Sequence, residues 1–176
     1  GHHADRERAS GFCLFNNMAI AVTKLTEQGK KVAILDIDGH HGDGTEKLLR
    51  DNNKAFFCSI HQQDIFPGTG HKSSKYCFNF PLKPPISKKD YLETLVKAVH
   101  KLKLLNPDIL GISIGFDTYK EDDLLDFNLD IETYREIGSL LKKDFSNVFA
   151  VLEGGYHNKI LECAEAFKAG VNSSIN

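Results

Sequence analysis

The feature that most constrains the fold is the apolar run "KVAIL", which leads at once into the polar segment "DIDGHHGDG" at residues 36–44. The run has the length and composition of a buried strand, and "DILGISIG" and "VFAVLEGG" repeat the pattern further along. Segments with apolar residues at helical spacing lie between these runs. Near-continuous apolar strands that alternate with amphipathic helices are typical of a parallel sheet covered on both faces. We therefore predict an α/β protein, a three-layer α/β/α arrangement with a mainly parallel sheet.

Turn and cap residues set the limits of the expected elements. Ser87 and Asp130 are expected to cap two helices, the Asn106-Pro107 pair to end the helix that Ser87 begins, and Gly29 to end the helix at residues 15–28. The expected helices cover residues 15–28, 45–50, 88–105, 131–142 and 159–168. The expected strands are residues 32–37, "NKAFFCSIH" to about residue 60, "YCFNFPL" at an edge, "DILGISIG" and "VFAVLEGG".

Size and charge narrow the class of protein. A chain of 176 residues with 41% hydrophobic and 26% charged residues can bury one core, so we predict a single domain over residues 1–176. The net charge of -2, without a basic stripe, argues against direct binding of nucleic acid. No apolar run approaches the ~20 residues that span a bilayer, so we expect no membrane segment.

Two further features concern the setting of the chain. The four cysteines have no CxxC spacing, so reduced thiols and a cytoplasmic location are expected; they are Cys13, Cys58, Cys77 and Cys163. The single methionine is Met18 and the chain opens on Gly1, so a fragment or a processed chain is expected.

Three of the expected strands end in segments with polar side chains, which are "DIDGHHGD", "GFD" and "EGGY". The carboxyl ends of parallel strands meet at one edge of the sheet, where ligands bind. Asp38 and His40, with Asp117 from a second strand end, would supply two carboxylates and one imidazole and leave a coordination position open, as a catalytic divalent metal requires. The alternative is a turn cluster in which Asp43 caps the helix at 45–50. That alternative leaves unexplained the carboxylates at the end of a buried strand, where an unpaired charge is costly.

Other motifs have ordinary interpretations when each is taken alone. "GHH" is compatible with a purification-tag remnant, Tyr156 with a turn aromatic, and "FPGTG" with a loop of tight turns. The remaining histidines are expected at the surface or in loops: His61, His71, His100 and His157.

The order of the motifs GHHA, GFCLFNN, DIDGHHGDGT, SIH, FPGTG, GFD and LEGGY closely resembles the histone deacetylase superfamily, which includes acetoin-utilisation proteins and acetylpolyamine amidohydrolases. The resemblance runs from Gly1 to about Leu161. It implies an arginase/deacetylase-like fold, and it argues against the tag interpretation of His2 and His3.

The resemblance also implies roles for individual residues. The metal ligands, for zinc or ferrous iron, are Asp38, His40 and Asp117. The catalytic groups are His2 and His3, the carboxylates Asp36 and Asp43 that orient them, and Tyr156. The substrate channel is lined by Phe12, Phe66 and Leu124. A structural potassium ion is held by Asp36, Asp38, His40, Ser59 and Ile60, and His41 is a supporting residue.

These groups suit the hydrolysis of an amide. Zinc polarises the carbonyl and lowers the pKa of water from 15.7 to about 7, and a neutral histidine can take the released proton. A histidine can later protonate the leaving amine, while a tyrosine hydroxyl donates to the oxyanion. We therefore expect an enzyme that removes acetyl or short acyl groups from lysine or a related amine through a metal-activated water.

The sequence departs from the family pattern in two ways. The family domain is longer, so the first sheet strands and a loop with a substrate-binding acid are expected to be absent from this N-terminally truncated domain. Leu124 stands where polyamine-specific members carry an acid, which argues against polyamines. The alternatives are a non-catalytic acyl-lysine-binding or scaffold domain, and an acetylpolyamine or small-amide hydrolase. The second histidine and Tyr156 favour catalysis, because a binding domain needs neither.

Overall fold

The computed structural model describes residues 1–173, and its central feature is a five-stranded sheet with the strand order β3-β2-β1-β5-β7. Every neighbouring pair in this sheet is parallel. The strands are β1 (Val32–Asp36), β2 (Ala55–Gln62), β3 (Cys77–Leu82), β5 (Ile109–Ile114) and β7 (Val148–Leu152). The predicted parallel sheet is confirmed, and β3 lies at one edge as expected.

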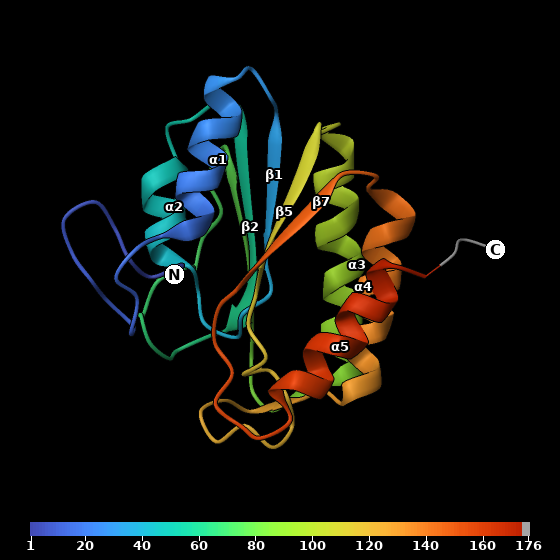
Figure 1. Cartoon of the computed structure of the whole chain (residues 1–176). Helices are drawn as coiled ribbons and strands as arrows, with labels where there is room; N and C mark the ends of the chain where they lie inside the picture. Colours follow the sequence, from blue (N-terminus) through green and yellow to red (C-terminus); the bar gives the residue numbers. More distant parts are fainter. Residues whose placement is uncertain (174–176) are drawn as a thin grey trace.

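Helices cover both faces of this sheet (Figure 1). The helices are α1 (Asn17–Glu27), α2 (Asp43–Leu49), α3 (Lys88–Leu104), α4 (Ile131–Asp144) and α5 (Ile160–Val171). On one face, α1 and α2 pack in an apolar core that includes Met18, Val22, Val32, Leu49 and Phe57. On the other face, α3, α4 and α5 share a larger core that includes Ala33, Leu95, Leu110, Ile137 and Phe167. This arrangement confirms the predicted three layers.

The two helix caps predicted from the sequence are present. The Ser87 hydroxyl accepts a hydrogen bond from the Asp90 backbone N–H at 3.1 Å, which satisfies an otherwise unpaired donor in the first turn of α3. Asp130 accepts from the Thr133 N–H at 2.8 Å in a reciprocal capping arrangement at the start of α4.

The structure also contains elements that the sequence pattern did not predict. Two strands of two residues each, β4 (Ile86–Ser87) and β6 (Phe127–Asn128), pair with each other in a small second sheet. Segments of this length carry no periodic pattern, so periodicity could not predict them. Helix α2 begins at Asp43 rather than at Thr45, with Gly42 as its N-cap residue.

The carboxyl ends of β1, β5 and β7 lie next to each other, because β5 pairs with β1 on one side and with β7 on the other. The loops that follow these strands therefore converge at one edge of the sheet. Within residues 1–173, none of the helices is long and apolar enough to cross a membrane. The single domain over residues 1–176 stays a prediction, and residues 174–176 lie outside the described part of the chain.

Candidate active site

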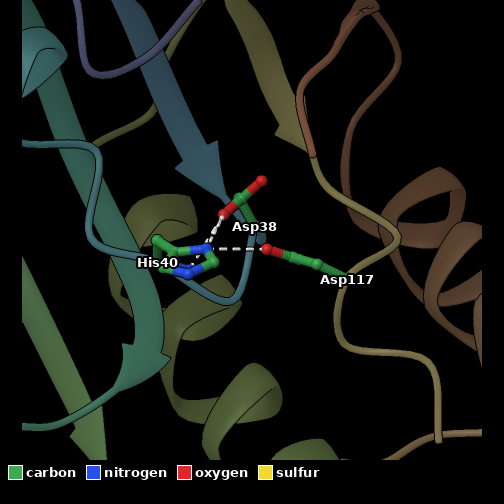
Figure 2. A group of neighbouring side chains, drawn as sticks. All are labelled: Asp38, His40 and Asp117. Atoms are coloured by element: carbon green, nitrogen blue, oxygen red, sulfur yellow. Dashed lines mark hydrogen bonds and ion pairs between the residues drawn. The ribbon is translucent and has the colours of Figure 1, made fainter. Parts of the chain in front are cut away.

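Three candidate metal ligands meet beyond the ends of β1 and β5. Asp38 and His40 lie in the loop after β1, and Asp117 lies in the loop after β5. The Nδ1 atom of His40 is 2.8 Å from Oδ2 of Asp117 and 3.2 Å from Oδ1 of Asp38. Dashed lines in Figure 2 mark these two contacts. One ligand atom from each residue lies within 4.8 Å of the other two. The structure therefore brings together the three side chains that the sequence placed at separate strand ends.

Backbone N–H donors hold the two carboxylates in place. The Gly154 N–H donates to Oδ2 of Asp38 at 2.8 Å, and the Gly39 N–H donates to Oδ1 of Asp117 at 2.9 Å. A Cβ atom at Gly154 would lie only 2.7 Å from Oδ2 of Asp38, so a side chain there would push into the carboxylate. The close approach of the backbone to Asp38 therefore requires glycine at position 154, the first glycine of "EGGY".

Burial and mutual repulsion dominate the electrostatics of these ligands. Burial, together with the charge of Asp38, raises the pKa of Asp117 to about 7. Burial also opposes ionisation of Asp38, but His2 and His40 outweigh it and lower the pKa of that carboxyl. Two buried carboxylates and an imidazole Nδ1 that face one point are a donor set that fits a divalent cation. The residues present therefore fit the metal that the sequence motifs imply.

Two histidine–carboxylate pairs lie beside the ligands. Nδ1 of His2 is 2.9 Å from Oδ2 of Asp36, and Nδ1 of His3 is 2.7 Å from Oδ1 of Asp43. The two imidazole rings are buried, with their centroids 4.0 Å apart. Each carboxylate fixes the orientation of its ring and leaves the Nε2 atom for another partner, which for His2 is Oδ1 of Asp38 at 3.6 Å.

The environments of the two histidines push their pKa values in opposite directions. Burial opposes the charged form of His2, but the charges of Asp36 and Asp38 prevail and raise its pKa to about 10. For His3, burial outweighs the hydrogen bond to Asp43 and lowers the pKa. A protonated ring and a neutral ring thus lie side by side near pH 7. Such a divergence separates the roles of acid and base in hydrolytic sites.

Tyr156 faces the same site. A cavity of about 110 Å³ lies between these groups; it is lined by Gly1, His2, His3, Gly11, Phe12, Cys13, Asp38, His40, Glu153, Gly154 and Tyr156. The Tyr156 side chain is 55% exposed at the mouth of this cavity, and its ring centroid is 6.1 Å from that of Phe12. Burial and the nearby charges of Asp38 and Asp117 raise the pKa of Tyr156 to about 12. The hydroxyl therefore stays protonated and can donate a hydrogen bond.

The three residues expected along a substrate channel differ in position. Phe12 lines the cavity. The ring of Phe66 packs edge-on against the His3 ring, with the two ring centroids 4.9 Å apart. Leu124 does not line this cavity; it is 52% exposed on the loop after β5. Its backbone N–H donates to Asp122, which also binds the backbone of Tyr156.

The residues expected to hold potassium lie at the end of β1, in the loop that follows it and within β2. Asp36 and Ser59 are direct partners across these two strands, and Asp36 accepts the Asp38 N–H at 3.2 Å. The side chains of Asp36, Ser59 and Ile60 are fully buried. His40, whose ring turns toward Asp117, completes the set with Asp38.

One expectation from the sequence and one alternative to the metal site are wrong. His61 is not a surface histidine: it is 1% exposed in β2, with Nδ1 2.9 Å from the Ser59 hydroxyl, because this strand is buried on both faces. The capping alternative for Asp43 also fails, because Gly42 occupies the cap position and the Asp43 carboxylate binds His3.

Other supporting residues had no assigned role from the sequence. Glu153 accepts hydrogen bonds from the His2 N–H at 3.0 Å and the Ser113 hydroxyl at 2.8 Å. Asn16 caps α1 and donates to the Ala4 carbonyl at 3.1 Å, which ties the "GHHA" segment to that helix. The position of Glu153 at a strand end was a usable signal, whereas the contacts of Asn16 depend on the folded chain.

The His41 ring makes two hydrogen bonds that support the site. Its Nδ1 lies 2.8 Å from the Thr69 hydroxyl and its Nε2 lies 2.9 Å from the Glu46 carboxylate. The ring therefore connects α2 with the "FPGTG" loop that carries Phe66.

Comparison with known proteins agrees with this geometry. The family model for the histone deacetylase domain matches residues 1–171, and the chain belongs to this family. An uncharacterised protein of Synechocystis is 42% identical over 89% of this chain and 54% of its own length. Acetylpolyamine amidohydrolase 2 of Pseudomonas aeruginosa is 35% identical over 89% of this chain and 48% of its own length.

Solved structures give the same result. The crystal structure of an acetylpolyamine aminohydrolase from Burkholderia pseudomallei superposes with a TM-score of 0.89 at 32% identity, over 97% of this chain and 53% of that one. The predicted deacetylase-like fold is thereby confirmed. The chain spans about half the length of the curated relatives it matches.

Proposed function

We propose that the protein containing this chain is a metal-dependent deacetylase, which removes acetyl or another short acyl group from lysine or a related amine. The observation that carries the proposal is the convergence of Asp38, His40 and Asp117 beside the two histidine–carboxylate pairs. Membership of the histone deacetylase family supports it.

Asp38, His40 and Asp117 would hold the metal, zinc or ferrous iron. When bound, the ion supplies Lewis acidity for the amide carbonyl and for the attacking water. The donor set leaves room for substrate, because three protein ligands do not complete a tetrahedral shell.

His3 acts as the general base in this proposal. Its lowered pKa keeps the ring neutral, and the hydrogen bond from Nδ1 to Asp43 leaves Nε2 available to take a proton from water as the water oxygen attacks the carbonyl carbon. A proton then passes from one of the two protonated histidines, His2 or His3, to the amine nitrogen as the carbon–nitrogen bond breaks. His2, held protonated by Asp36, keeps positive charge beside the reacting carbonyl.

The Tyr156 hydroxyl donates a hydrogen bond to the carbonyl oxygen as negative charge develops there. Phe12 and Phe66 form the aromatic walls that the alkyl chain of the substrate passes. Leu124, whose backbone shares the Asp122 carboxylate with Tyr156, is the third proposed channel residue. A leucine in place of an acid at position 124 favours acyl-lysine over acylpolyamine as the substrate. Acetylpolyamine remains the second candidate, because named relatives act on it.

We also propose a structural potassium ion at Asp36, Asp38, His40, Ser59 and Ile60, on the basis of the family motif and the adjacency of Asp36 and Ser59. The free state of all four cysteines supports a reducing, cytoplasmic setting. The near-neutral charge gives no reason to expect a nucleic-acid partner.

The test is metal analysis of the whole protein combined with deacylation assays on acetyl-lysine peptides, acetylpolyamines and small acetylated amides. Hydrolysis that a chelator abolishes and zinc or ferrous iron restores would support the proposal. Tight binding of acyl-lysine by the metal-loaded protein without turnover of any of these substrates would instead establish a non-catalytic binding domain.

A further inference from the structure

We propose that Asp122 is a positioning residue for Tyr156, an inference that rests on the deacetylase function proposed above. The Asp122 side chain is 6% exposed, and its Oδ2 atom accepts a hydrogen bond from the backbone N–H of Tyr156 at 2.9 Å. Its other oxygen, Oδ1, accepts the backbone N–H of Leu124 at 3.0 Å. One buried carboxylate therefore holds the backbone of Tyr156 against the loop that carries Leu124.

Tyr156 needs such an anchor because neither the preceding glycines nor the packing of its own ring fixes it. It follows Gly154 and Gly155, and Gly155 has a φ of +133°, a conformation that glycine adopts without strain. The ring of Tyr156 is more than half exposed, so core packing does not fix it. The hydrogen bond to Asp122 is thus the contact that holds the backbone N–H of Tyr156 itself, two residues beyond Gly154, whose N–H donates to the metal ligand Asp38.

A second contact holds the next residue in the same way. Nε2 of His157 lies 2.8 Å from the Phe116 carbonyl oxygen, to which the ring N–H donates, and the His157 ring stacks on Tyr119 with centroids 4.6 Å apart. The segment after β7 is therefore held on the segment after β5 at two successive residues. Tyr156 and the metal ligand Asp117 thereby share one supporting loop.

The contacts at position 122 require a carboxylate rather than an amide side chain. Two N–H donors converge on two different oxygens, so an amide side chain, which has one oxygen, can satisfy only one of them. None of the salt bridges among residues 1–173 involves Asp122, so the backbone N–H groups balance its charge in place of a cation. The Asp122→Asn substitution keeps size and shape, but its NH2 group must face one of the two N–H donors whichever way the amide turns. The two-point contact is then lost, and the Tyr156 backbone should loosen.

The consequence falls on the transition state. A hydroxyl that donates to a developing oxyanion must lie within hydrogen-bond reach of it, and a misplacement of about 1 Å can cost about 100-fold in rate. Asp122 touches no reacting atom in this scheme and acts only through Tyr156. Its loss should therefore lower kcat and leave ground-state binding of ligand almost unchanged.

The kinetic test uses the whole, metal-loaded protein and four variants. Asp122→Asn should lower kcat by about tenfold or more with an inhibitor Kd within about twofold of wild type. Asp123→Asn, which makes the same charge change at the exposed neighbouring residue, is the matched control and should leave kcat intact. In the Tyr156→Phe background, Asp122→Asn should cost less than about twofold, because the hydroxyl it positions is gone. An equal loss in both backgrounds, or an unchanged kcat, would overturn the inference.

A second measurement does not depend on activity or on the folding of a variant. In the wild-type protein, the Tyr156 amide hydrogen should exchange with solvent more slowly than that of exposed Asn158, because it is donated to a buried carboxylate. Equal exchange rates would overturn the positioning role whatever the activity. Protection of the Tyr156 amide in a protein that hydrolyses no acyl substrate would support the anchor and refute the deacetylase function, so the two failures are distinguishable.

Discussion

Nδ1 of His3 lies 2.7 Å from Oδ1 of Asp43, a residue in the first turn of α2 and 40 positions further along the chain. This contact joins the "GHHA" segment to the segment after β1, and it directs the Nε2 atom of His3 toward the cavity beside the candidate metal ligands. A second pair, His2 with Asp36, repeats the arrangement one residue earlier. The two pairs differ in protonation, and this difference makes their roles separable by experiment.

Replacement of His3 by alanine should abolish most turnover and leave the metal bound. General acid–base groups contribute about 100- to 10,000-fold in rate, and His3 is not one of the three candidate ligands. The measurement is kcat together with metal content for the whole protein. Wild-type turnover in His3→Ala would refute the proposed general base, and loss of metal in that variant would show that His3 supports the ligands instead.

The pH profile should report the environment of His3. Its pKa lies below the ordinary value of 6.5 and the base must be neutral, so the acidic limb of kcat/KM is expected below pH 6.5. Asp43 raises this pKa; therefore Asp43→Asn should shift the acidic limb to still lower pH while it reduces the maximal rate. Glu7→Gln, an exposed charge change in the same N-terminal segment, serves as the control. A shift of the limb to higher pH in Asp43→Asn would contradict the assignment.

Asp117→Ala should lower the metal stoichiometry well below one ion per chain. The substitution removes one of three ligands and leaves Asp38 and His40 with an incomplete site. Metal content by atomic spectroscopy is the readout, and exposed Asp123→Ala is the control. Full metal occupancy in Asp117→Ala would remove this residue from the ligand set.

The sequence was sufficient to predict the sheet, the layers and the convergence of Asp38, His40 and Asp117, because each follows from apolar runs and from the topology of parallel sheets. It was not sufficient for Asp122, whose contact with Tyr156 spans 34 positions between two loops of irregular backbone. His61 was misplaced for a related reason. A strand buried on both faces shows no alternation, so a histidine within it looks like one in a loop.

Substitution of Gly138 by alanine should destabilise the fold without a direct effect on the site. Helices α4 and α5 cross closely at this residue, and a Cβ atom there would lie 2.8 Å from the Val171 backbone nitrogen. Overpacking of this kind costs about 1–3 kcal/mol, which exceeds the gain in helix propensity from glycine to alanine. Chemical denaturation of the whole protein measures the effect, with exposed Lys143→Ala in the same helix as the control. Unchanged stability would mean that the two helices can move apart at no cost.

Tyr156→Phe separates an enzyme from a binding domain. The hydroxyl contributes only as charge develops on the carbonyl oxygen, so its removal should lower kcat by about 100- to 1000-fold while inhibitor affinity changes little. The ring would keep its place, because the backbone anchor to Asp122 and the edge-on contact with Phe12 do not involve the hydroxyl. Rates and affinities must be compared at equal metal content, since a loss of metal alone would mimic the effect. If the two proteins deacylate at the same rate, Tyr156 does not stabilise the transition state; if inhibitor affinity falls in parallel with kcat, the hydroxyl serves ground-state binding.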